Sequence, residues 1–287
     1  MQHVKAIFLD MDGTILRENN RSSDYTAEII AQLRKTGYKV FLATGRAKEE
    51  ISLLVPKTMI FDGIISSNGT IGHVGEEVLF QHGLAEASVR SIVKKAQQEG
   101  IYYEIFPFNQ SRFSCKADQS WMLELIAGDK PQSVGASEWL SRHEAVEGKL
   151  TWYDAIPAGL KYSKIYMFHP DLDKIAAFRQ MIKEQMETLR IEVSQSTPNN
   201  VETMAYQVNK GTGIEEMCRH FNIDIADTLV IGDSDNDRSM FKVGGVTVAM
   251  RNANDSIKAL TAYETRVDNN HDGAARFLAE ALLKHQL

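Results

Sequence analysis

Short apolar runs alternate with amphipathic helical patterns at the start of the chain. Residues 4–9 form a nearly all-apolar run, which suits a strand buried on both faces of a parallel sheet. Residues 25–35 place apolar side chains on one helical face, and Gly37 follows where that helix would end. The alternation continues with strands predicted at 40–43 and 63–66 and a helix predicted at 47–54. This order is typical of a doubly wound α/β sheet.

The C-terminal part of the chain repeats the alternation. Apolar runs predict strands at 228–231 and 246–250, and helical spacing predicts helices at 214–221, 238–243, 257–260 and 273–283. Because strands and helices of the same kind occur at both ends, we expect the two ends to build one parallel sheet together.

The middle of the chain has a different pattern, in which helices accompany strands that look antiparallel. Helices are predicted at 85–98, 119–127 and 171–185, and strands at 102–107, 112–116, 164–168, 190–194 and 201–205; residues 128–161 give no clear pattern. Such a mixture favours an α+β domain. We therefore predict a discontinuous Rossmann-like core, 1–82 and 207–287, with an inserted α+β cap domain at 83–206.

Composition narrows the possible partners. The chain has 287 residues, 43% of them hydrophobic, and a formal net charge of −6, which argues against nucleic acid as the main partner. The two cysteines, Cys115 and Cys218, form no metal-binding spacing. No apolar stretch reaches the roughly 18 residues of a membrane span, and residues 1–5 lack the features of a signal peptide. We expect a cytoplasmic protein without membrane contact; its oligomeric state cannot be read from these patterns.

The first candidate for chemistry is Asp10-Met11-Asp12-Gly13-Thr14, directly after the predicted first strand. Carboxylates two residues apart on an extended chain point to the same side, and ligands of open α/β sheets bind beyond the strand ends. Two crowded carboxylates repel each other unless a cation such as Mg²⁺ lies between them. An ordinary turn that caps the strand is the alternative.

Two further candidates could bind an anionic oxygen. Thr44-Gly45-Arg46 follows the strand at 40–43 and offers a hydroxyl and backbone N–H groups at the start of a helix. Taken alone, Thr44 is more simply the N-cap of that helix. Lys210-Gly211 precedes the helix at 214–221, and its ammonium group suits a phosphate or a carboxylate. A solvated surface lysine is the alternative.

The fourth candidate is Gly232-Asp233-Ser234-Asp235-Asn236-Asp237, after the strand at 228–231. Acidic and amide groups are again crowded at the end of a strand, and an acidic loop is the alternative. The run superficially resembles a calcium-binding EF-hand loop. It lacks the glycine at the sixth loop position and the glutamate at the twelfth, so we reject that interpretation.

In combination, the four motifs DxDGT, TGR, KG and GDxxND have the order and spacing of the haloacid dehalogenase superfamily. The chain resembles this superfamily over essentially its whole length. The chain looks most like the Cof-type phosphatases, whose large α/β cap lies between the second and third motifs. The resemblance implies that Asp10 is the nucleophile that takes the phosphoryl group as an aspartyl-phosphate. Asp12 would be the general acid and base, and Thr44 and Lys210 would hold the phosphoryl oxygens.

The resemblance also implies a magnesium site and contacts to the substrate. Asp10, the backbone carbonyl of Asp12 and the Asp233 carboxylate would bind Mg²⁺, and Asp237 would support these ligands from behind. Residues implied as contacts to substrate or phosphate are Gly45, Arg46, Asn68 and Asn236. Asn68 also suits a simple turn, and Arg46 could equally form a structural ion pair.

One departure from the family pattern is Arg251 in the segment AMRNA, where the family has glycine. If this position requires a positive φ, Arg251 is strained; it could instead add a cation near the site. The expected reaction is Mg²⁺-dependent hydrolysis of a small phosphorylated metabolite, such as a sugar phosphate or a phosphorylated cofactor. A phosphotransferase or mutase, and a non-catalytic regulatory binding protein on the same fold, are the alternatives. The substrate cannot be named from the sequence.

Overall fold

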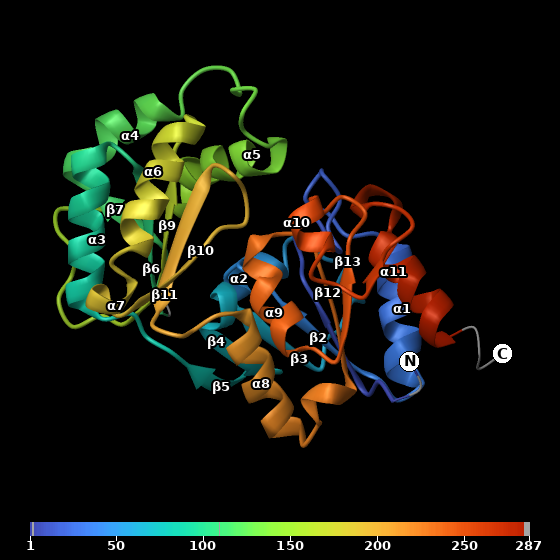
Figure 1. Cartoon of the computed structure of the whole chain (residues 1–287). Helices are drawn as coiled ribbons and strands as arrows, with labels where there is room; N and C mark the ends of the chain where they lie inside the picture. The colour runs from blue at the N-terminus through green and yellow to red at the C-terminus, as the bar shows by residue number, and fades with distance from the viewer. Residues whose placement is uncertain (2, 109, 284–287) are drawn as a thin grey trace. The chain divides into compact units, whose positions relative to one another are not determined.

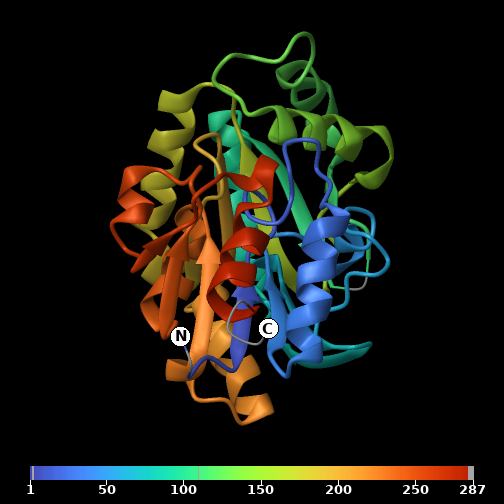
Figure 2. The ribbon, with the colours of Figure 1, turned by 90° about the vertical axis from the view of Figure 1, so that its right-hand side faces the viewer.

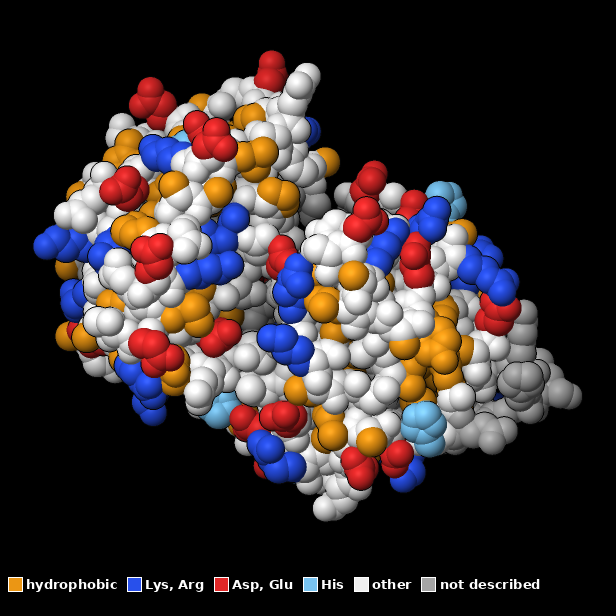
Figure 3. All heavy atoms as spheres, viewed as in Figure 1, with side chains coloured by type: hydrophobic (Ala, Val, Ile, Leu, Met, Phe, Trp, Pro, Cys, Tyr) orange, Lys and Arg blue, Asp and Glu red, His pale blue; other side chains and the backbone are white. Residues whose placement is uncertain are grey.

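The computed structural model describes residues 1, 3–108 and 110–283 and divides the chain into two compact units. One, called the core unit here, comprises Met1–Gln81 and Asn209–Leu287, and the inserted unit comprises His82–Val208. Among the described residues, no helix is both long and apolar enough to cross a bilayer. On the face in Figure 3, acidic and basic side chains are interspersed.

The core unit is built on an eight-stranded sheet whose order is β14-β13-β12-β1-β2-β3-β4-β5. The pairs from β14 to β3 are parallel, and β4 and β5 are added antiparallel at one edge. The strands are β1 (Ala6–Leu9), β2 (Lys39–Ala43), β3 (Gly63–Ser66), β4 (Ile71–Val74), β5 (Glu77–Gln81), β12 (Thr228–Gly232), β13 (Val246–Ala249) and β14 (Tyr263–Glu264). The expected α/β fold class with a doubly wound parallel sheet is confirmed.

Helices cover both faces of this sheet. The α-helices of the core unit are α1 (Asp24–Lys35), α2 (Lys48–Ile51), α8 (Lys210–Phe221), α9 (Arg238–Val243), α10 (Asp255–Lys258) and α11 (Gly273–Leu278). Shorter turns are η1 (Ser67–Gly69), η4 (Ile225–Asp227), η5 (Asp235–Asp237), η6 (Asn269–His271) and the π-helical η7 (Ala279–Leu283). Figure 1 shows α8 and α9 on one side of the sheet, and Figure 2 shows α1 and α11 next to each other on the opposite side.

The all-apolar sequence of β1 follows from this layering. Ile7 and Leu9 pack in the cluster that contains α1 and α11, whereas Ala6 and Phe8 pack in the cluster that contains α8 and α9. Because successive side chains of a strand point to opposite faces, a strand covered on both sides needs apolar residues at every position. This is why the run at 4–9 could be recognised as a central parallel strand.

The inserted unit contains a separate six-stranded sheet, with the order β10-β11-β9-β6-β7-β8. Its strands are β6 (Tyr102–Pro107), β7 (Phe113–Cys115), β8 (Thr151–Tyr153), β9 (Tyr162–Phe168), β10 (Ile191–Ser194) and β11 (Asn200–Ala205). Its helices are α3 (Glu86–Glu99), α4 (Gln119–Leu125), α5 (Ala136–Glu144), α6 (Leu172–Lys183) and α7 (Met186–Leu189), with the turns η2 (Lys116–Asp118) and η3 (Ala145–Lys149). All strand pairs are antiparallel except β7 with β8.

A buried ionic cluster lies on the sheet of the inserted unit. The fully buried Glu104 on β6 accepts hydrogen bonds from Arg112 (2.9 Å), from Arg142 on α5 and from the Tyr102 hydroxyl (2.9 Å). Burial alone would raise the pKa of Glu104, but Arg142 and Arg112 outweigh burial and hold the pKa below its usual value. Glu104 is therefore an ionised group inside the unit, kept so by two guanidinium groups.

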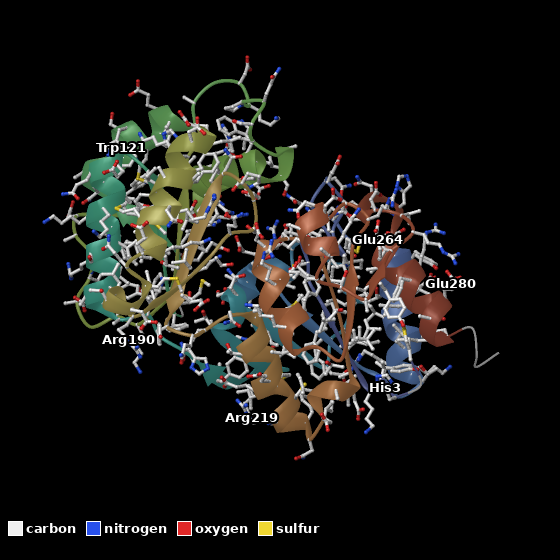
Figure 4. The ribbon with its side chains drawn as sticks, in the orientation of Figure 1. His3, Trp121, Arg190, Arg219, Glu264 and Glu280 are labelled. Atoms are coloured by element: carbon white, nitrogen blue, oxygen red, sulfur yellow. The ribbon has the colours of Figure 1, made fainter. Side chains whose placement is uncertain are left out.

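Replacing Glu104 by alanine should strongly destabilise the inserted unit, because it removes the carboxylate that offsets the charge of two buried guanidinium groups. We expect a loss of about 3–5 kcal/mol in the free energy of unfolding. Urea unfolding followed by tryptophan fluorescence reports this unit selectively, since Trp121 (labelled in Figure 4), Trp139 and Trp152 all belong to it. The exposed Glu184 is the control, and Glu184→Ala should leave the midpoint almost unchanged. Equal midpoints for both variants would contradict the ionic role.

Candidate active site

Three neighbouring strands of the core sheet end in polar residues. Asp10 follows β1, Thr44 follows β2 and Asp233 follows β12, and β1 lies between the other two strands. Because the three strands are parallel, these ends lie at one edge of the sheet, where ligands of open α/β sheets bind. Asp10 and Thr44 are almost fully buried, so their side chains are held inside this edge.

Lys210, the first residue of α8, points into the group of acidic side chains. Its ammonium group donates to Asp10 Oδ1 (2.5 Å) and to Asp237 Oδ1 (2.7 Å), and its side chain has no exposed surface. The helix begins here because the Asn209 side chain accepts from the Thr212 N–H, while Thr212 Oγ1 accepts from the Asn209 N–H. This reciprocal capping fixes the position from which Lys210 reaches the carboxylates.

Asp233 approaches the first loop closely. A Cβ atom at Gly13 would lie 2.2 Å from Asp233 Oδ2, and Gly13 has a φ of +71°, so this position has room only for glycine. Asn252 donates from its amide to Gly13 O (2.9 Å) and to Asp233 Oδ2 (3.3 Å). The other oxygen, Asp233 Oδ1, is buried and has no hydrogen-bond partner, which is a costly state for a carboxylate oxygen unless a ligand binds it.

Asp10, Asp233 and Asp237 form an acidic cluster in which one oxygen of each lies within 4.8 Å of the others. Burial and the neighbouring carboxylates raise the pKa of Asp10 and of Asp233, although Lys210 opposes both shifts. One ammonium group cannot balance three carboxylates. The cluster therefore favours an additional cation, and oxygen ligands of this kind suit a hard divalent ion such as Mg²⁺.

Asp237 plays a different part from the other two acids. Its Oδ2 accepts from the N–H groups of Asp233 (2.9 Å) and Ser234 (3.1 Å), and its Oδ1 accepts from Lys210. A Cβ atom at Gly232 would lie 2.4 Å from Asp237 Oδ2, so only glycine allows this carboxylate to lie against the backbone of the loop. Asp237 thus holds the loop that carries Asp233 and positions Lys210.

The turn at Ser67–Gly69 connects three of the loops. Asn68 donates from its N–H to Thr44 O (2.9 Å) and accepts from the Asn236 amide through Oδ1 (3.2 Å). A Cβ atom at Gly69 would lie 2.0 Å from Asn209 O. Ser67, Asn68 and Gly69 all have positive φ, which brings their backbone close to the neighbouring loops.

Comparison with known proteins identifies the family. A sequence model of the haloacid dehalogenase-like hydrolases matches residues 7–278. The chain belongs to this family. The hydrolase is 25% identical over 294 residues to the 5-amino-6-(5-phospho-D-ribitylamino)uracil phosphatase YwtE of Bacillus subtilis, covering 97% of this chain and 98% of that protein. It is 26% identical over 294 residues to the phosphatase YwpJ of the same organism, covering 97% and 100%.

Solved structures agree with this family assignment at the level of the fold. A haloacid dehalogenase-like hydrolase from B. subtilis superposes with a TM-score of 0.81 at 21% identity, covering 97% of this chain and 100% of that one. A subclass IIB sugar phosphatase of the superfamily superposes with a TM-score of 0.70 at 23% identity, covering 96% and 98%. The resemblance stated from the motifs is confirmed.

The hydrolase brings most of the expected site residues together, but Asp12 and Arg46 form a separate pair. The Arg46 guanidinium contacts both carboxylate oxygens of Asp12, at 2.6–3.0 Å. The Asp12 side chain is 42% exposed and lies outside the acidic cluster identified among the described residues. Gly45, partly buried, links Thr44 and Arg46. The carboxylate that joins Asp10 and Asp233 in that cluster is Asp237.

Arg251 is explained by its surroundings. It does not have a positive φ, so the side chain causes no backbone strain. The guanidinium group is mostly exposed and pairs at 2.9 Å with Glu264, labelled in Figure 4. The neighbouring Asn252, which contacts Asp233, was not assigned a role from the sequence. Asn252 lies in the segment AMRNA, which matches a segment of the family except at Arg251, and this match could have marked it as a site residue.

Adding a single methyl group at Gly13 should displace Asp233 and weaken binding of divalent cations. We expect Mg²⁺ to raise the melting temperature of the wild-type protein and to leave that of Gly13→Ala unchanged. Gly75→Ala is the matched control, because Gly75 also has a positive φ (+59°) but its Cβ would meet nothing within 4 Å. Both substitutions place a Cβ atom in the left-handed region and carry a backbone penalty of about 1–2 kcal/mol. A Mg²⁺-induced shift in Gly13→Ala as large as in Gly75→Ala would refute the steric argument.

Proposed function

We propose that the hydrolase is a Mg²⁺-dependent phosphatase that removes phosphate from a small phosphorylated metabolite through an aspartyl-phosphate on Asp10. The observation that carries this proposal is the cluster of the buried Asp10 and Asp237 and the partly buried Asp233 around Lys210 at the ends of parallel strands. The names of the relatives support the substrate class, since YwtE acts on a phosphorylated ribitylaminouracil and a structural neighbour is a sugar phosphatase. A cytoplasmic location stays a prediction from the sequence.

Asp10 has the properties of a nucleophile for phosphoryl transfer. Its carboxylate would form a bond to phosphorus while the bond from phosphorus to the ester oxygen breaks, which divides one difficult displacement into two easier ones. The Lys210 ammonium, 2.5 Å from Asp10 Oδ1, would balance negative charge on the phosphoryl oxygens. Because Lys210 is fixed by the helix cap and by Asp237, little reorganisation is needed when the charge develops.

Thr44 would complete the phosphate site. Its backbone is fixed on both sides, since its N–H donates to Ile65 O (2.9 Å) and its carbonyl accepts from Asn68 (2.9 Å). The hydroxyl oxygen accepts from the Arg46 N–H at 3.1 Å, and its proton can be donated to a phosphoryl oxygen. Asn236, whose amide is held by Ser234 and Asn68, is placed beside the same loops.

The residues present fit a magnesium ion. Asp233 Oδ1 is a buried carboxylate oxygen without a partner, and three crowded carboxylates face a single ammonium group. Asp10, the backbone carbonyl of Asp12 and Asp233 would hold the ion. When bound, Mg²⁺ would neutralise the carboxylates and the phosphate so that one anion can approach another.

Asp10→Asn should abolish turnover and preserve the fold, because the amide keeps the shape of the side chain and loses the nucleophilic charge. We expect the rate of phosphate release from a panel of phosphorylated sugars and cofactors to fall roughly a thousandfold or more. Asp227→Asn is the control, since Asp227 precedes β12 at the opposite end of the strand from Asp233 and pairs with Lys5 on the surface. Wild-type rates in Asp10→Asn would rule out the nucleophile.

Removing divalent cations should stop phosphate release, and adding Mg²⁺ should restore it. Asp233→Asn should raise the Mg²⁺ concentration needed for half-maximal activity, because an amide oxygen is a weaker ligand than a carboxylate. Arg251→Met is a useful control nearby, since Arg251 pairs with Glu264 outside the cluster. Full activity in the presence of EDTA would contradict the metal requirement.

A further inference from the structure

The Arg46–Asp12 pair has a geometry that goes beyond a surface ion pair. Arg46 Nε lies 3.0 Å from Asp12 Oδ1 and 2.8 Å from Oδ2, and Arg46 Nη2 lies 2.6 Å from Oδ1. The guanidinium edge therefore faces both carboxylate oxygens, which fixes the orientation of the carboxylate as well as its charge. The Arg46 side chain is 16% exposed and the Asp12 side chain 42%, so the guanidinium end of the pair is shielded while the carboxylate end stays open to solvent.

The backbone of Arg46 is anchored in the loop that carries Thr44. Its N–H donates to Thr44 Oγ1 (3.1 Å), and its carbonyl accepts from the Ser67 N–H (2.9 Å). The guanidinium group thus extends from a fixed point at the end of β2 to Asp12 in the loop after β1. Two loops from adjacent strands are joined by this one side chain.

We propose that Arg46 is the positioning residue of Asp12, and that this pair adapts the hydrolase to phosphate esters of ordinary alcohols. The inference rests on the proposed phosphatase function. Esters of ordinary alcohols release a strongly basic alkoxide, so proton donation to the ester oxygen matters for their cleavage. Aryl esters with acidic phenols release a stable phenolate and need this proton far less.

The proton and bond changes assign a specific part to Arg46. In the first step, Asp10 bonds to phosphorus, the ester P–O bond breaks, and the proton of Asp12 passes to the leaving oxygen. Asp12 is then a carboxylate, the form that the Arg46 fork contacts through both oxygens. In the second step, water attacks phosphorus, the bond from phosphorus to Asp10 breaks, and the water proton passes to Asp12. Arg46 would stabilise and orient the charged Asp12 between the two steps.

This assignment differs from a direct role of Arg46 in phosphate binding. A guanidinium group that bound the phosphoryl oxygens would contribute equally to every phosphate ester and to inorganic phosphate. A group that acts through Asp12 should instead accelerate the cleavage of an ester more strongly when its leaving oxygen is more basic and therefore needs a proton. The two roles can therefore be separated by changing the leaving group while the phosphoryl group stays the same.

The test compares Arg46→Met with the wild-type protein on n-propyl phosphate and on 4-nitrophenyl phosphate, both with Mg²⁺. We expect kcat/KM for n-propyl phosphate, which reports only the steps up to the aspartyl-phosphate, to fall about a hundredfold, within the range of general acid catalysis. The kcat/KM for 4-nitrophenyl phosphate should stay within a few-fold of wild type, and inhibition by inorganic phosphate should be unchanged. Arg238→Met is the matched control, because Arg238 pairs with Asp235 near the Asp233 loop and should affect neither ester.

Two further variants test whether Arg46 acts through Asp12. In an Asp12→Ala background, Arg46→Met should cause no additional loss, as expected for residues that act as one unit. Arg46→Lys should recover only part of the n-propyl phosphate activity, because an ammonium group keeps the charge and lacks the planar fork. Circular dichroism and melting temperatures, measured for Arg46→Met and Arg46→Lys alike, identify any folding defect in the methionine variant.

The inference is overturned by three results. An equal loss of kcat/KM on both esters, together with weaker inhibition by phosphate, would make Arg46 a phosphate ligand. No loss on either ester would make the pair purely structural, and additive losses in the double variant would separate Arg46 from Asp12. If the wild-type protein released no phosphate from any phosphomonoester, the proposed function would fail and this inference with it.

Discussion

The crowding of three carboxylates around one ammonium group is the constraint on which the site depends. Asp10, Asp233 and Asp237 come from two loops after neighbouring strands, and Lys210 comes from the start of α8. Like charges so close together persist only where partners offset their repulsion. The Lys210 ammonium offsets part of the negative charge, and the backbone N–H groups that donate to Asp237 offset more. Asp233 Oδ1, which has no hydrogen-bond partner, marks the place where a cation would offset the remaining charge.

Close backbone approach is the second requirement, and it explains the glycines of the motifs. Side chains at Gly13, Gly232 and Gly69 would collide with Asp233, Asp237 and the Asn209 carbonyl, respectively. Each of these contacts joins two chain segments that are far apart in sequence or bends one loop onto itself. The charged cluster can form only because the loops pack without Cβ atoms at these points. The glycines of the motifs are therefore needed to bring the charged residues of the motifs together.

The sequence predicted the central sheet well because strands such as β1 and β12 are covered on both faces and are apolar at nearly every position. The hairpin of β4 and β5 was missed, since β5 is a mostly exposed edge strand whose apolar residues do not alternate with polar ones. The segment around α5 depends on long-range contacts such as Arg142 with Glu104, which no local pattern reveals. Within the site, motif spacing suggested which side chains meet; the pairing of Arg46 with Asp12 depends on side-chain packing between loops, and their roles stay predictions.

The stereochemical course at phosphorus tests the central claim most directly. Each in-line displacement at phosphorus inverts its configuration, so two successive displacements through Asp10 restore it. A phosphorothioate ester whose phosphorus carries sulfur and two different oxygen isotopes can be hydrolysed by the wild-type hydrolase with Mg²⁺ in water labelled with the third isotope. The released thiophosphate then has four different substituents on phosphorus, and the account predicts that it retains the original configuration. Inversion would mean that water attacks the substrate directly, and it would contradict a covalent intermediate on Asp10.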